Sequence, residues 1–233
     1  MTVTSWDEPA GANPRGTLIV LPGRGETPAA YERFGRRLAA DAYRVRLVPV
    51  ALADVEAARV TVEKLLADEE LPGPKVLVGA DSGATLAALL APEIAVDAVV
   101  VAGLALPDSA GVGSWDDEIE ARTACPVHRS VITGDDGFGR GGLNEPLPWS
   151  SVELAPSGKP TLLLHGSADP ITPAAAALAP YAGAEDVRVR VVNDGRHDVL
   201  NDASHRSVAA TIVLFLESLR LGSELPEIVR AAS

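Results

Sequence analysis

The stretch VLVGADSGATLAALLA, residues 76–91, contains the transition that decides the fold. Its first part is an apolar run typical of a buried strand, and its Ala- and Leu-rich second part is typical of a helix. Gly79 and Gly83 mark the turn between the two. This spacing fits G-x-S-x-G, the sequence of a nucleophile elbow, which is a sharp strand-to-helix turn that exposes one reactive side chain. Here the central position holds Asp81, and Ser82 follows it.

Length and composition predict one globular domain over residues 1–233, because 47% of the residues are hydrophobic and apolar runs are spread along the chain. The formal net charge of -12 argues against binding to nucleic acid or to an anionic membrane surface. The first residues lack the pattern of a signal peptide, so we expect a cytoplasmic protein. No Cys/His cluster has the spacing of a metal site, and the only cysteine is Cys125.

Short Val-, Leu- and Ile-rich runs alternate with longer segments of helical pattern, which predicts an α/β fold with a mostly parallel sheet flanked by helices. The expected strands are 17–21, 44–50, 75–78, 98–102, 160–164 and 187–192. The expected helices are 29–40, 53–68, 83–91, about 173–180 and 203–220.

The stretch from about 107 to 159, named the cap segment below, interrupts this alternation. It is rich in glycine and proline and contains two of the three tryptophans. A connection of this length inside a compact domain is commonly a binding lid or an active-site loop. We therefore expect a small cap inserted into the domain, with His128 on the surface of the cap.

Two further motifs follow apolar strands. LLLHGSADPITP, residues 162–173, places Asp169 just beyond one strand, and NDGRHDVLND, residues 193–202, places His197 in a polar loop after the next. The resulting order is elbow, acid, histidine, which is the chain order of a hydrolase triad built on an α/β sheet. Asp108, at the end of the preceding strand, is an alternative acid.

With these motifs the sequence resembles the α/β-hydrolase superfamily over roughly residues 15–220. The resemblance implies that Asp169 orients His197 and that His197 acts as general base. LPGRG, residues 21–25, stands where the superfamily has its oxyanion loop. The resemblance implies that backbone N–H groups of Ser82 and of Gly23 or Arg24 stabilise negative charge. The Arg24 side chain could add a positive charge there or bind an acidic substrate.

An aspartate at the elbow changes the expected chemistry. A carboxylate is suited to attack a saturated carbon and form an alkyl ester, whereas its attack on an ester carbonyl would give an anhydride. Haloalkane dehalogenases and epoxide hydrolases of the superfamily use such an aspartate, but their accessory residues are missing: Ser82 stands in place of tryptophan, and the cap segment has no tyrosine. Ser82 itself is an alternative nucleophile, although centring the motif on it loses both glycines.

The sequence thus predicts a hydrolase acting on a small, largely apolar molecule, with esterase-like and alkyl-displacement chemistry both open. The second hypothesis is a non-hydrolytic enzyme, such as a lyase or cyclase, or a catalytically silent protein that binds a ligand in the same pocket. We expect no cofactor, because neither the G-x-G-x-x-G dinucleotide fingerprint nor the phosphate-binding P-loop pattern is present.

Overall fold

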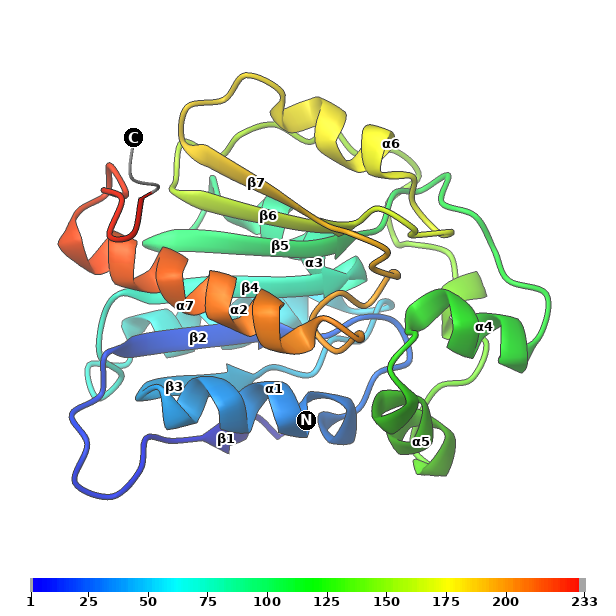
Figure 1. Ribbon diagram of the computed structural model, residues 1–233, viewed down its shortest axis with the longest axis horizontal. Coiled ribbons are helices and arrows are strands. Elements are labelled where there is room, and N and C mark those ends of the chain that lie inside the picture. Colours follow the sequence, from blue (N-terminus) through cyan, green and yellow to red (C-terminus); the bar gives the residue numbers. More distant parts are fainter. Residues whose placement is uncertain (1, 231–233) are drawn as a thin grey trace.

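The computed structural model describes residues 2–230. Within them a seven-stranded sheet has the order β1-β3-β2-β4-β5-β6-β7. Neighbouring strands are parallel, except for the antiparallel pair β1 and β3. This confirms the predicted mostly parallel α/β architecture (Figure 1). The strands are β1 Thr4–Trp6, β2 Gly16–Leu21, β3 Tyr43–Leu47, β4 Lys75–Asp81, β5 Ala98–Leu104, β6 Thr161–Gly166 and β7 Val187–Val192.

Helices cover both faces of the sheet. In the described residues these are α1 Pro28–Ala40, α2 Val55–Ala67, α3 Ser82–Leu90, α4 Trp115–Arg122, α5 Pro126–Gly134, α6 Ala174–Leu178 and α7 His205–Leu221, with short 3-10 turns η1 Gly142–Asn144 and η2 Ala179–Tyr181. Helices α1 and α7 pack on one face, and α2, α3 and α6 pack on the other. Because both faces are covered, strands β4, β5 and β6 are buried almost throughout, as their apolar runs predicted.

Several strands depart from the sequence prediction. Strands β4, β5 and β6 continue two or three residues beyond their predicted ends, to Asp81, Leu104 and Gly166. Strand β1 was not predicted, because a three-residue strand has no apolar run of its own and depends on pairing with β3. Strand β3 ends at Leu47, earlier than the predicted 44–50, since Pro49 cannot donate to a neighbouring strand.

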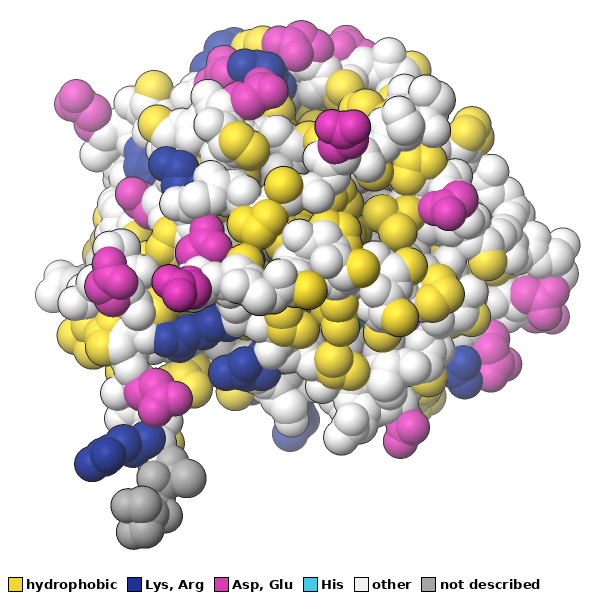
Figure 2. Space-filling model, turned by 90° about the horizontal axis from the view of Figure 1, so that it is seen from above, with side chains coloured by type: hydrophobic (Ala, Val, Ile, Leu, Met, Phe, Trp, Pro, Cys, Tyr) yellow, Lys and Arg dark blue, Asp and Glu magenta, His cyan; other side chains and the backbone are white. Residues whose placement is uncertain are grey.

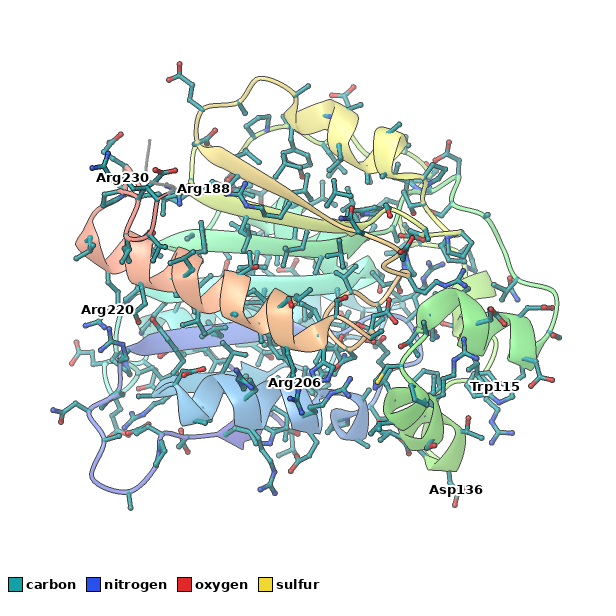
Figure 3. The ribbon with its side chains drawn as sticks, in the orientation of Figure 1. Trp115, Asp136, Arg188, Arg206, Arg220 and Arg230 are labelled. Atoms are coloured by element: carbon teal, nitrogen blue, oxygen red, sulfur yellow. The ribbon has the colours of Figure 1, made fainter. Side chains whose placement is uncertain are left out.

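The cap segment connects β5 to β6 and contains α4, α5 and η1, which lie beyond the carboxyl ends of the strands (Figure 1). Trp115, labelled in the cap region of Figure 3, contacts the buried ring of Phe138 with 5.7 Å between ring centroids. These two aromatic residues of the cap segment therefore pack against each other.

No helix among residues 2–230 is both long and apolar enough to span a bilayer. The face of the molecule above β7 and α6 carries acidic and basic side chains scattered among apolar ones (Figure 2). On that face the basic side chains do not form a continuous patch.

Two glycines allow the turn from β4 to α3 to form. A Cβ atom added at Gly79 would lie 2.2 Å from the carbonyl oxygen of Gly83, and one added at Gly83 would lie 2.2 Å from that of Leu21. Both neighbours are backbone atoms of packed elements, so neither can move aside cheaply. The elbow therefore requires glycine at both positions for reasons of space.

We predict that Gly83→Ala lowers the free energy of unfolding by about 3 kcal/mol, because the added methyl group overpacks the contact between α3 and β2. Urea denaturation followed by circular dichroism measures the change. Gly134→Ala is the matched control, since a Cβ there meets no heavy atom within 4 Å. Equal stability of the two variants would contradict the steric explanation.

Candidate active site

The elbow aspartate ends β4 in a backbone conformation that is rare for a residue with a side chain. Asp81 has φ 50° and ψ -120°, immediately before α3 begins at Ser82. A non-glycine residue at such a φ costs of order 1–3 kcal/mol and is found mainly at functional sites. The strained turn directs the carboxylate of Asp81 toward the loops that follow β6 and β7.

The structure brings the three predicted triad side chains together. His197 Nε2 lies 3.0 Å from Asp81 Oδ1, and His197 Nδ1 lies 2.8 Å from Asp169 Oδ2. Asp169 comes from the loop after β6 and His197 from the loop after β7, so parallel strands deliver all three residues to one edge of the sheet. His197 contacts Asp81 rather than Ser82, so the elbow is centred on Asp81.

His197 lies between two carboxylates, and this controls its charge. Burial by itself favours the neutral ring, but the charges and hydrogen bonds of Asp169 and Asp81 outweigh it and raise the pKa of His197 to about 9. At neutral pH the ring is therefore a buried cation. Burial also works against ionised Asp169, yet His197 and His165 hold its pKa below the ordinary value.

The side chain of Arg24 forms a bidentate ion pair with Asp81. Arg24 Nη2 lies 2.7 Å from Oδ1, and Nε lies 2.9 Å from Oδ2 and 3.2 Å from Oδ1. Burial of Asp81 opposes its ionisation, but the charges and hydrogen bonds of Arg24 and His197 hold its pKa well below the ordinary value. Asp81 is therefore an ionised carboxylate with a cation on each side.

Of the two predicted oxyanion-loop donors, Arg24 is the one directed at residue 81. Its backbone N–H donates to Asp81 Oδ2 at 2.7 Å. The N–H of Gly23 instead donates to Glu26 Oε2 at 2.8 Å and faces the Tyr31 hydroxyl at 3.2 Å. The oxyanion loop thus already holds one oxygen of the elbow carboxylate.

The cap segment contacts this loop through backbone groups. Arg24 Nη1 donates to the carbonyl oxygens of Leu143 at 3.0 Å and Glu145 at 2.9 Å. Gly139 donates its N–H to the carbonyl of Gly25 at 2.8 Å. With these contacts in place Arg24 is only 6% exposed, and Asp81 and His197 are 4% and 1% exposed. The site is closed in this conformation.

A second set of buried charged residues, which no sequence motif indicated, supports the loop. Arg122 donates to the carbonyl of Arg24 at 2.7 Å and pairs with Glu118 at 2.7 Å and Glu26 at 3.3 Å. Burial, together with the charge of Asp198, raises the pKa of Glu26 against the effect of Arg122. Only the i,i+4 spacing of Glu118 and Arg122 on α4 was visible in the sequence, and such pairs are usually solvent-exposed.

Two other histidines occupy places that the sequence did not fix. The prediction of a surface position for His128 is wrong: its ring is buried, and its Nε2 lies 3.0 Å from Asp198 Oδ2. His165 is fully buried, and its Nε2 lies 3.0 Å from Asp169 Oδ2. The alternative acid Asp108 is exposed, whereas Asp169 is the carboxylate that contacts His197.

Asp108 lines a separate cavity of about 380 Å³. Its other lining residues are Leu106, Pro107, Ser150, Ser151, Val152, Leu154 and Pro180. The lining residues do not include Arg24, Asp81, Asp169 or His197, so this cavity does not open directly onto Asp81. Among the residues that the structure describes, no group of three or more His, Cys, Asp or Glu side chains is arranged to hold a metal ion.

Comparison with known proteins supports the fold. No protein family model matches the sequence, and no curated protein does either. Among solved structures, the monoacylglycerol lipase of Paleococcus ferrophilus aligns with a TM-score of 0.72 at 17% identity, over 93% of this chain and 98% of that one. A soluble variant of the monoglyceride lipase of Saccharomyces cerevisiae, in complex with a substrate analogue, gives 0.69 at 14% identity, over 92% and 90%.

A third structure, the meta-cleavage product hydrolase of Pseudomonas fluorescens, aligns with a TM-score of 0.67 at 15% identity, covering 93% of this chain and 94% of that one. At such identities the similarity concerns the fold alone. Over nearly its whole length, the chain has the α/β-hydrolase fold.

Proposed function

We propose that this protein is a hydrolase in which Asp81 attacks a saturated carbon of a small, largely apolar substrate. The observation that carries the proposal is the different environment of the two Asp81 oxygens. Oδ2 accepts the backbone N–H of Arg24, while Oδ1 faces His197. This difference supports a role for Oδ2 as the carbonyl oxygen of the ester and a role for Oδ1 as the nucleophile. The names of the structural neighbours also describe hydrolases.

In the first step Oδ1 forms a bond to the substrate carbon, and the bond from that carbon to its leaving group breaks. The leaving group departs with the electron pair, as a halide or as the alkoxide of an opened epoxide. Negative charge therefore passes from Asp81 to the leaving group, and the cations of Arg24 and His197 that had paired with the carboxylate can pair with the new anion. An alkoxide would take the Nε2 proton of His197.

In the second step the alkyl ester is hydrolysed. Esterification removes one of the two carboxylates beside His197, so the ring releases its Nε2 proton more easily, to the alkoxide of an opened epoxide or, after departure of a halide, to solvent. The neutral ring can then act as general base. Water then attacks the carbonyl carbon of the ester, and negative charge develops on Oδ2, where the N–H of Arg24 already donates. One proton of the water passes through His197 to the departing alkoxide, and the other ends on the His197 ring, so breakdown releases the alcohol and restores the Asp81 carboxylate beside a protonated His197.

Substrate entry requires a rearrangement. Three nitrogen atoms, Arg24 Nε, Arg24 Nη2 and His197 Nε2, occupy the surroundings of Oδ1. A substrate carbon can approach this oxygen only when the guanidinium group shifts and the cap segment moves from the oxyanion loop. The substrate is therefore expected to be small.

A second candidate function, non-hydrolytic catalysis or ligand binding alone, is favoured by the same ion pair. A carboxylate held by a buried arginine is a weak nucleophile, because its charge is already compensated. In that case the Asp81–His197 pair would transfer protons or bind a ligand without forming an ester.

The covalent intermediate provides the direct test. We predict that His197→Ala, incubated with alkyl halides or epoxides, accumulates an alkyl ester on Asp81, because the general base needed for the second step is absent. Intact-mass measurement and peptide mapping detect the added group and locate it. The control is the double variant Asp81→Asn/His197→Ala, which should remain unmodified.

An adduct on Ser82 would contradict the assignment of Asp81 as nucleophile. Wild-type protein that fails to turn over a panel of alkyl halides, epoxides and aryl esters, while some ligand raises its melting temperature, would favour the second candidate. Turnover that persists in Asp81→Asn would exclude Asp81 both as the nucleophile and as a proton-transfer partner of His197.

The charge of His197 gives a prediction that needs no substrate. We expect its ring to titrate near pH 9 in the wild type and at least about one unit lower in Asp81→Asn, because one of its two carboxylate partners is lost. ¹⁵N NMR of labelled histidine rings measures both values. Asp108→Asn, which removes an exposed carboxylate that does not contact His197, should leave the titration of the His197 ring unchanged.

The raised pKa of His197 also makes the free energy of unfolding depend on pH. A raised pKa means that the folded protein binds the proton more tightly than the unfolded chain, so the stabilisation is complete below about pH 6.5 and is lost as the pH rises through about 9. Asp81→Asn should show a smaller loss of unfolding free energy across this interval. An equal or steeper loss would contradict the predicted charge of the ring.

A further inference from the structure

The acid of the candidate triad has a second histidine partner. Asp169 Oδ2 lies 2.8 Å from His197 Nδ1 and 3.0 Å from His165 Nε2. The other oxygen, Oδ1, accepts the backbone N–H groups of Ile171 at 2.8 Å and Thr172 at 3.2 Å. Asp169 is thus held by two backbone donors and two imidazole rings. The role of His197 follows from its contact with Asp81, whereas His165 has no such contact.

The surroundings of His165 fix its tautomer. Its Nε2 faces two acceptors, the carbonyl oxygen of Thr172 at 2.8 Å and Asp169 Oδ2 at 3.0 Å, so this nitrogen carries the proton. Its Nδ1 is buried and has no hydrogen-bond partner within residues 2–230. A proton there would leave a buried N–H group unpaired, which is costly. His165 is therefore expected to keep a proton on Nε2.

The two imidazoles that share Oδ2 consequently act differently on Asp169. His197 lies between two carboxylates, whereas His165 faces Asp169 and a backbone carbonyl oxygen. His165 can thus restrict the orientation of Asp169 without contacting Asp81. The titratable groups that face Asp169 are His165 from β6 and His197 from the loop after β7, with Asp81 of β4 beyond His197.

We propose that His165 is a positioning residue: its Nε2–H group donates to the Thr172 carbonyl oxygen, lies 3.0 Å from Asp169 Oδ2, and thereby fixes the direction of the Asp169–His197 hydrogen bond. The inference rests on the proposed function insofar as that bond serves catalysis. His165 is not a catalytic residue, because it acts only through Asp169. Its expected effect is on the turnover step and not on substrate binding.

The test compares His165→Met, of similar size but without a donor, with His165→Gln, whose side-chain amide can place an N–H group near the former Nε2. In His165→Met we expect kcat to fall about tenfold with KM unchanged, the lower end of what loss of an outer partner costs at organised sites. His165→Gln should recover most of the activity. A purely packing role predicts the opposite order, since methionine fills the apolar space better.

An NMR measurement without substrate separates this proposal from the proposed function. The Nδ1–H resonance of His197 should shift or broaden in His165→Met and return to its wild-type position in His165→Gln. An unchanged resonance in His165→Met, with a wild-type melting temperature, would overturn the positioning role. If the wild type turns over no substrate, the proposed function fails while this measurement still decides the role of His165. Should His165→Met not fold, His165→Asn, whose amide is too short to reach Asp169, replaces it.

Discussion

A buried carboxylate stays ionised only where cations and N–H groups replace the water that it has lost. Asp81 satisfies this requirement with Arg24 on one side and His197 on the other, and with a backbone N–H group on Oδ2. A serine at this position would carry no charge and would need no arginine beside it. The exchange of a hydroxyl for a carboxylate at the elbow therefore accounts for the ion pair, the protonated histidine and the closed oxyanion loop together.

The balance of buried charges also constrains residues other than Asp81. Two carboxylates, Asp81 and Asp169, are matched by two cations, Arg24 and His197. Removing one member leaves an uncompensated buried charge, which costs far more than an exposed ion pair contributes. The surrounding elements, including the cap segment and the helix that carries Arg122, are thus constrained to keep the arginine near the elbow.

Much of this arrangement could be predicted from the sequence, because parallel strands with apolar runs fix where their carboxyl ends lie. Asp81 at the end of β4, and Asp169 and His197 in the loops after β6 and β7, come together for that reason. The ion pair between Arg24 and Asp81 could not be predicted, since the loop conformation that aims the side chain has no periodic signal.

The buried positions of Glu118, Arg122 and His128 could not be predicted from the sequence either. Charged and polar residues on short helices resemble a solvated surface until the docking of those helices is known. Strand β1 illustrates the same limit for backbone structure, because it exists only through its pairing with β3.

The attachment of Arg24 to the cap segment has an evolutionary consequence. Its Nη1 binds the main-chain carbonyl oxygens at positions 143 and 145, and every residue type supplies such an oxygen. These two hydrogen bonds therefore do not depend on side-chain identity, whereas an insertion or deletion in the loop would remove them. Homologous proteins would then be expected to conserve the length of this loop while varying at position 145, where the side chain is exposed.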